Sequence, residues 1–272
     1  PDDDATWMEK IVGDKTNEIN KAGLPKVMEP FFAHLQALAE RAEARGAEKA
    51  GFLFNETGYH FKTVANYSAA RAALERAIAI DEKTLGADHP QVATFVNNLG
   101  TVYEDMGELP AARTTLERAL AIDENSLGTD HPNVASDVNN LGMVYKDMGD
   151  LPAARAAFER AIAIDEKTLG ADHPQVATFV NNLGLVYKAM SDLLAARAAY
   201  ERALAIDEKS FGTEHPNVAI RVNNIGGVYE AIGNLSKAHA YYQRALAIME
   251  KYAPNNPNTK TARENLERVS RG

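Results

Sequence analysis

Residues Ile80–Gly100 read IDEKTLGADHPQVATFVNNLG, and the same 21 letters return at Ile164–Gly184. Looser copies occupy Ile122–Gly142, as IDENSLGTDHPNVASDVNNLG, and Ile206–Gly226, as IDEKSFGTEHPNVAIRVNNIG. Aligning the copies on their single histidine gives a strict period of 42 residues, set by His89, His131, His173 and His215. A period between about 20 and 50 residues is typical of stacked repeats, in which each unit packs on its neighbours. The sequence therefore predicts a solenoid.

Each repeat divides into two predicted helices. The first follows a His-Pro pair, as at residues 91–106, because proline suits the first helical turn, where its missing N–H has no partner to lose. The second opens at a Leu-Pro pair, as at residues 109–127, and ends before a glycine. Small residues such as Gly100 and Ala112 should let the two helices approach closely. Connections this short make consecutive helices antiparallel neighbours.

We therefore expect an all-α, right-handed superhelical solenoid of antiparallel helix pairs. Residues 1–46 should form N-terminal capping helices, residues 47–256 five repeats of 42 residues, and residues 257–272 a C-terminal capping helix. A cap covers the apolar end that a terminal repeat would otherwise expose. The N-terminal pair has a second interpretation, as the remnant of a connection to a further domain upstream.

The composition limits the class of function. A net charge of −9 opposes nucleic acid binding, which needs a clustered basic face, and leaves basic or neutral partners. The chain has no cysteine, which rules out disulfides and thiolate metal sites and fits a cytoplasmic location. No apolar run reaches the length of about 18 residues that a membrane helix needs. No GxxxxGK[ST], HExxH or GxSxG motif occurs, so we expect no enzyme activity, no cofactor and no membrane contact.

The histidine at each period resembles a metal ligand but fits one poorly. Ligands must lie about 2 Å from a shared ion, whereas equivalent positions of stacked repeats lie at least about 8–10 Å apart. Each histidine also stands directly before the proline that starts a helix. We therefore expect a structural role at the helix N-terminus and no metal site.

The order Leu99-Gly100, Tyr103, Ala112, Leu116, Ala119 resembles the tetratricopeptide repeat. The longer period, with ALAIDEKTLG, DHP, NNLG and VY at fixed places, is similar to the kinesin light chain type and to the C-terminal arrays of NB-ARC (STAND) signalling NTPases of bacteria and archaea. Residues 26–46 (KVMEPFFAHLQALAERAEARG) and 53–61 (LFNETGYHF) are similar to the segment that introduces the array in STAND proteins. The phosphate loop of those NTPases is not in this chain.

The resemblance implies that the first helix of each repeat lines a concave groove that binds peptides or proteins. It places the second asparagine of each NNL motif in that groove: Asn98, Asn140, Asn182 and Asn224. An amide both donates and accepts, so a row of them can hold an extended backbone. An equal alternative is that these amides satisfy backbone groups of neighbouring repeats, the role we favour for Asn97, Asn139, Asn181 and Asn223.

Positions beside that row differ between near-identical repeats, where specificity would lie. The candidates are Tyr59, Thr94, Thr101, Asp105, Met143, Asp147 and Leu185. We expect a non-catalytic scaffold that binds a protein or peptide in the groove, as the sensor or interaction arm of a STAND-type protein. The alternative is an architectural array that spaces or oligomerises attached domains without a peptide ligand.

Overall fold

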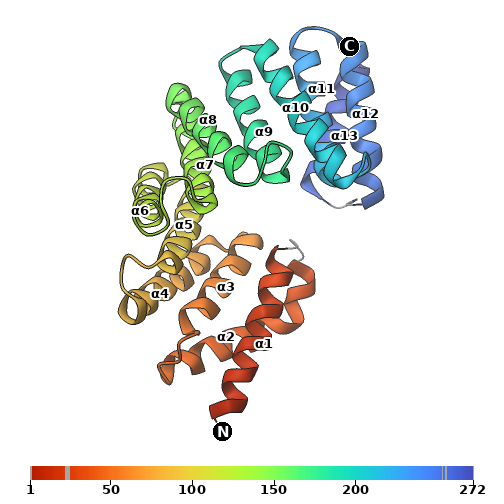
Figure 1. Cartoon of the computed structure of the whole chain (residues 1–272). Coiled ribbons are helices and arrows are strands. Elements are labelled where there is room, and N and C mark those ends of the chain that lie inside the picture. Colours follow the sequence, from red (N-terminus) through yellow and green to blue (C-terminus); the bar gives the residue numbers. More distant parts are fainter. Residues whose placement is uncertain (1, 22–24, 253, 255, 272) are drawn as a thin grey trace. The chain divides into compact units, whose positions relative to one another are not determined.

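The computed structural model describes residues 2–21, 25–252, 254 and 256–271, which form thirteen helices and no strand (Figure 1). The helices are α1 (Asp2–Lys21), α2 (Pro25–Ala44), α3 (Ala50–Thr63), α4 (Tyr67–Leu85), α5 (Pro90–Asp105), α6 (Leu109–Leu127), α7 (Pro132–Asp147), α8 (Leu151–Thr168), α9 (Pro174–Ala189), α10 (Leu193–Phe211), α11 (Pro216–Ala231), α12 (Leu235–Tyr252) and α13 (Pro257–Ser270). Among these helices, none combines the length and the apolar composition that a bilayer crossing requires.

The chain forms two compact units, Pro1–Asn140 and Leu141–Gly272, and each is described by itself. In the first unit, α3 packs against α4 and α5 against α6, while α4 also contacts α5. In the second unit, α9 packs against α10 and α11 against α12, α10 contacts α11, and α13 packs on α12. Consecutive helices are therefore neighbours, as the short connections predict, and each unit is a piece of an all-α helical-repeat solenoid.

The His-Pro pairs start the first helix of each repeat. His89, His173 and His215 are N-caps, and the Nδ1 atom of each accepts a hydrogen bond of 3.1–3.2 Å from the N–H two residues later. His131 makes the same bond to Asn133, at 3.1 Å. These bonds satisfy a donor that a helix N-terminus leaves unpaired. The predicted structural role of the histidines is confirmed.

The glycine of each Asn-Asn-Leu-Gly or Asn-Asn-Ile-Gly motif lets the two helices of a repeat approach closely. A Cβ atom at Gly100 would lie 2.6 Å from Leu116, and one at Gly184 would lie 2.6 Å from Tyr200. Contacts this short do not occur between real side chains, so alanine there would displace the facing residue. The close approach predicted from the small residues is confirmed.

Arginine–glutamate pairs connect the second helices of neighbouring repeats. Three pairs join an arginine to a glutamate one repeat earlier, and a fourth joins the first repeat to α2: Arg118 to Glu82, Arg202 to Glu166, Arg244 to Glu208, and Arg76 to Glu43. All are partly exposed, so each contributes no more than about 1 kcal/mol. They tie one repeat to the next, and we assign no binding role to them.

The terminal helices pack against the helices next to them, and their role as caps stays a prediction. In α13, which begins at Pro257, Asn256 takes the place of the histidine and accepts a bond of 2.8 Å from the Asn258 N–H. At the other end, α1 and α2 contact α3, and Leu35 of α2 is fully buried. Phe31, also on α2, is 51% exposed.

Candidate functional site

The Asn-Asn pairs lie on the first helix of each repeat and bond to one another through their side chains. In the first unit, Asn98 Nδ2 donates to Asn55 Oδ1 at 2.8 Å, and Asn140 Nδ2 donates to Asn97 Oδ1 at 3.0 Å. The second asparagine of one repeat thus reaches the first asparagine of the repeat before it. Asn139 Nδ2 in turn donates to Asn140 Oδ1 at 3.2 Å. We call these five residues, together with their counterparts in the second unit, the asparagine row.

The counterparts in the second unit are Asn181, Asn182, Asn223, Asn224 and Asn265. Asn224 Nδ2 donates to Asn181 Oδ1 at 2.8 Å, and Asn265 Nδ2 donates to Asn223 Oδ1 at 3.0 Å. The sequence analysis missed Asn265, because α13 reads Glu-Asn-Leu-Glu where the repeats read Asn-Asn-Leu-Gly or Asn-Asn-Ile-Gly. The sequence spacing could have revealed Asn265, because it follows Pro257 by the same number of residues as Asn98 follows Pro90.

The row changes the interpretation of both asparagines. We expected the first asparagine of each pair to satisfy backbone groups, but its partner in the neighbouring repeat is a side-chain amide. An amide has two N–H donors and an oxygen that accepts two bonds. Asn140 uses one donor in its hydrogen bond to Asn97 and one acceptor site in the bond that it receives from Asn139. Its half-buried side chain therefore keeps one donor and one acceptor in a fixed orientation.

Lys62 ties the predicted flanking residues of the first unit together. Its Nζ atom donates to Thr101 Oγ1 at 2.8 Å and lies 3.5 Å from an Asp105 carboxylate oxygen. Thr94 is exposed one turn before Asn98, and its hydroxyl donates to the Pro90 carbonyl oxygen at 3.2 Å.

Tyr59 is half-buried on α3. Burial raises the pKa of its hydroxyl, and the negative charge of Glu56 adds to that rise.

In the second unit the flanking positions are more apolar. Met143 and Leu185 are half-buried, and Leu185 packs against a core cluster that contains Tyr200. Asp147 is exposed and lies 2.6 Å from Lys146. Every predicted site residue lies on the first helix of its repeat, from α3 to α11. Their joint action as a binding site stays a prediction.

A second charged group, formed by Arg268 and Glu230, lies in the second unit. Arg268 of α13 donates to both carboxylate oxygens of Glu230, at 2.6 and 2.8 Å, and the Tyr242 hydroxyl donates to Glu230 at 2.6 Å. The Arg268 hydrogen bonds lower the pKa of Glu230 to about 2. Glu230 lies on α11, and its partners lie on α12 and α13.

The tetratricopeptide repeat family model matches residues 58–125, 92–167, 135–209 and 175–251, which together cover more than half of the chain. The chain belongs to the tetratricopeptide repeat family. No curated protein matches its sequence significantly.

Solved structures match these tetratricopeptide repeats over most of their length. BtubC (BKLC) from P. vanneervenii is 23% identical, with a TM-score of 0.67 over 86% of this chain and 92% of that chain. The nearly identical TPR-like repeats of a Podosopora anserina protein assigned as a kinesin light chain are 26% identical, with a TM-score of 0.63 over 76% and 99%. The quorum sensor NprR from B. thuringiensis is 11% identical, with a TM-score of 0.65 over 91% and 68%. The predicted kinesin-light-chain-like repeat fold is confirmed.

The tetratricopeptide repeats also bury acids that the sequence analysis missed. Asp81, Asp123, Asp165 and Asp207, on the second helices, are at most 2% exposed. Burial raises the pKa of Asp81 and of Asp165 to about 6, although a nearby histidine opposes the rise. The Ile-Asp pair, which stands at the same place in every copy, could have predicted these buried acids, because it puts an acid directly beside an apolar residue in each repeat.

One position of the first helix carries a side chain that varies between the repeats. It holds Phe95, Asp137, Phe179 and Arg221 in turn. Arg221 is 5% exposed, and its Nε atom lies 3.0 Å from Asp207 Oδ2, which neutralises the buried acid. Asp137 is 3% exposed and faces Asp123, so two acids are buried together. Burial, with the charges of Asp123 and Glu124, raises the pKa of Asp137 to about 8.

Proposed function

We propose that this chain binds an extended segment of another protein along the asparagine row. The amides hold the backbone of the segment, and Tyr59, Thr94, Thr101, Met143 and Leu185 select among its side chains. Asp105 and Asp147 contribute charge at the edge. The chain acts without catalysis or a cofactor, as an interaction scaffold.

The observation that carries this proposal is the state of Asn140, whose amide uses only one donor and one acceptor site within the described residues. Each inter-repeat bond fixes the orientation of a second asparagine before any ligand arrives. Asn140 keeps one donor and one acceptor, which is the pair that a peptide unit of an extended chain needs. Groups that are already ordered lose little conformational entropy on binding, so the row suits a ligand of low sequence demand.

We further propose that this scaffold is the sensor or interaction arm of a STAND-type signalling protein. The support is the similarity of residues 26–46 and 53–61 to the segment that introduces such arrays, together with the 42-residue period. A sensor arm has to present a binding face while its other end carries an effector, and a solenoid separates the two.

The row also decides which variants test the proposal. Replacing Asn140 by alanine would remove a ligand contact and an inter-repeat bond together, so stability and binding would both change. Thr94 avoids this problem, because its exposed hydroxyl bonds only within its own helix, to Pro90. Thr114 of α6 is a matched control, since it is also exposed and donates to the Pro110 carbonyl at 3.1 Å.

The experiment selects phage-displayed random dodecapeptides on the chain and titrates one selected synthetic peptide by fluorescence anisotropy. Thr94→Arg places a long cation one turn from Asn98, so the Kd should rise at least about tenfold, with an unchanged melting temperature. Thr114→Arg should leave the Kd within about twofold. Equal Kd values for the two variants, or no selected peptide, would contradict the groove and favour the architectural array.

A further inference from the structure

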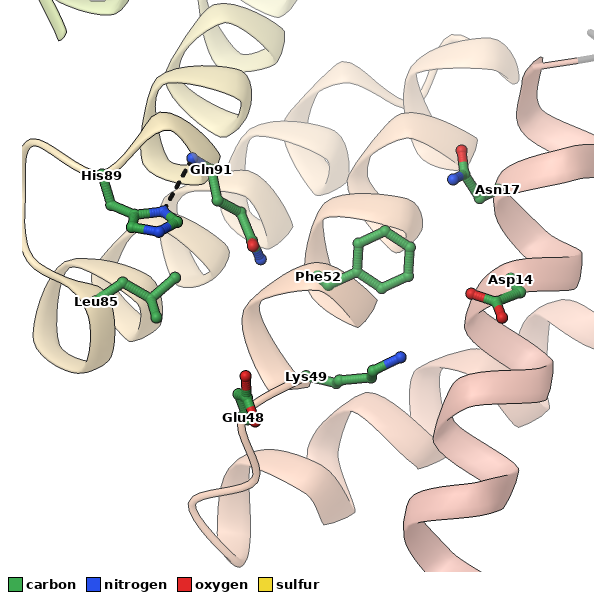
Figure 2. Close-up of a pocket in the computed structure, with 8 residues that line it drawn as sticks. All are labelled: Asp14, Asn17, Glu48, Lys49, Phe52, Leu85, His89 and Gln91. Atoms are coloured by element: carbon green, nitrogen blue, oxygen red, sulfur yellow. Dashed lines mark hydrogen bonds between the residues drawn. The ribbon is translucent and has the colours of Figure 1, made fainter. Parts of the chain in front are cut away.

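A cavity of about 410 Å³ opens in the first unit between α1, α3 and the start of α5 (Figure 2). The Phe52 ring stands in the middle of it, with Asn17 and Asp14 of α1 on one side and Gln91 of α5 on the other. Glu48 and Lys49, just before α3, close a third side. A volume above about 300 Å³ is in the range of ligand sites.

The cavity is the non-repeated part of a repetitive molecule. Phe52 occupies the position that holds Thr94 in the next repeat, and its ring lies against α1, where a Cβ atom at Gly13 would come within 2.9 Å of it. A second glycine, Gly51, stands where the next repeat has Ala93, and a Cβ atom there would lie 2.0 Å from Asp81 Oδ1. Gly13 thus makes room for an aromatic ring that the later repeats do not have, whereas the carboxylate behind Gly51 is buried in the later repeats as well.

The charges around the ring are unbalanced. Asp14 and Glu48 line the cavity with exposed carboxylates, and Asp81 lies buried behind Gln91. Burial raises the pKa of Asp81 to about 6, so this acid is largely ionised at neutral pH. The Gln91 amide opposes the rise, although neither Asp81 oxygen has a hydrogen bond of regular geometry within the described part of the chain.

Lys49 supplies the one ammonium group among the lining residues, and its Nζ atom points toward Asp14 (Figure 2). The described residues include no ion-pair partner for it within 4 Å. One ammonium against the two carboxylates that line the cavity leaves it negative, and the buried Asp81 adds to this, which favours a cationic ligand. Lys49 then occupies the place of that ligand's charge, on a flexible stem that can move aside.

The shape of the cavity selects between cations. A guanidinium group is planar, stacks on an aromatic face and pairs with a carboxylate through two parallel N–H groups. Phe52 offers the face, Asp14 the carboxylate, and Leu85 an apolar surface for the aliphatic stem. A compact ammonium would use only the carboxylate.

The cavity also joins the asparagine row. Glu56, one turn after Phe52 on α3, takes the position of Asn98 in the next repeat. It is 5% exposed and accepts hydrogen bonds from Asn20 Nδ2 of α1 at 2.7 Å and from Asn55 Nδ2 at 3.4 Å. The row therefore continues into the wall that Phe52 and α1 share.

We propose that this cavity binds an arginine side chain of the segment that lies along the asparagine row, with the guanidinium over Phe52 and paired with Asp14 in place of Lys49. This inference rests on the proposed function for the source of the arginine. The cavity itself binds the side chain without help from the rest of the row.

The test titrates the ¹⁵N-labelled chain with Nα-acetyl-arginine N-methylamide and follows amide chemical shifts. The arginine probe should shift the signals of residues 48–52 and 89–91, and the citrulline analogue, an uncharged isostere, should not. Asp14→Asn should weaken binding at least about fivefold, and Lys49→Met should strengthen it about threefold, because a competing cation is removed. Glu117→Gln, which removes an exposed carboxylate on α6, is the charge-matched control and should leave the affinity unchanged.

Equal binding of the citrulline analogue, or no shift with either probe, would overturn the inference. So would a loss of binding in Lys49→Met, because it would show that this lysine supports the bound probe and does not compete with its guanidinium. The outcome is separable from the groove. The arginine probe is a single capped residue that does not need the row, so a groove that fails its own test leaves this result standing. A selected peptide whose affinity depends on Thr94 but not on Asp14 would refute the cavity alone.

Discussion

Replacing Asp137 by asparagine should stabilise the first unit, and the gain should grow with pH. Asp137 is 3% exposed, and Asp123 and Glu124 are the charged groups that raise its pKa together with burial. Its Oδ2 atom and the Oδ1 atom of Asp123 have no hydrogen-bond partner within the described residues. Asparagine keeps the shape of the side chain and removes the charge.

The size of the effect follows from the pKa. An aspartate in an unfolded chain has a pKa near about 3.9, whereas the folded pKa of Asp137 is about 8. The fold therefore favours the protonated form, and the ionisation penalty is absent below pH 4, grows with pH and is complete above pH 8. Each pH unit in this window is worth about 1.4 kcal/mol, so the advantage of Asp137→Asn should rise by about 2–3 kcal/mol from pH 5 to pH 7.

Urea unfolding followed by circular dichroism at both pH values measures this advantage. Asp88→Asn is the control, because Asp88 is exposed in the loop before α5 and the substitution changes the net charge equally. The slopes of the unfolding curves should agree between variants, so that the midpoints report stability. A difference between wild type and Asp137→Asn that does not change with pH would refute the reasoning, and so would an equal gain in Asp88→Asn.

Three further predictions concern the second unit and use thermal unfolding. Tyr200→Phe should raise stability by about 1 kcal/mol, because the buried Tyr200 hydroxyl has no partner among the described residues. Tyr242→Phe should lower stability by about 1 kcal/mol, because the Tyr242 hydroxyl donates to a carboxylate. Equal effects of the two substitutions would contradict this reasoning. Gly184→Ala should cost about 1–3 kcal/mol, because its Cβ atom would lie 2.6 Å from Tyr200; a neutral result would show that the helices can separate. Arg221→Ala should cost about 3–5 kcal/mol at pH 7, since it leaves Asp207 buried and unpaired. The loss should shrink as the pH falls, because burial raises the pKa of Asp207 and favours its neutral form.

The asparagine row shows how far sequence reasoning reaches. The spacing of the Asn-Asn pairs identified the helix on which they lie, because a helix depends on residues within a few turns of each other. It did not identify the partner of each amide. Asn140 and Asn97 are 43 residues apart, and only the stacking of one repeat on the next brings their side chains to 3.0 Å.

The buried acids show the same limit. Asp137 looks like an ordinary polar substitution within a variable repeat position, and nothing local distinguishes it from the exposed Asp130. Its environment comes from α6, which places Asp123 and Glu124 beside it. The presence of Phe95 and Phe179 at equivalent positions was an available signal that this site faces the core.

The sequence by itself determined the period, the two helices of each repeat, their start at His-Pro and their close contact at glycine. These features depend on hydrogen bonds and sterics within a few residues, and each repeat encodes them again. Only the tertiary structure determined which amides bond to each other, which acids are buried together and where a cavity forms beside Phe52. Those contacts join residues from different helices, and their energy depends on exclusion of water, which no single repeat achieves alone.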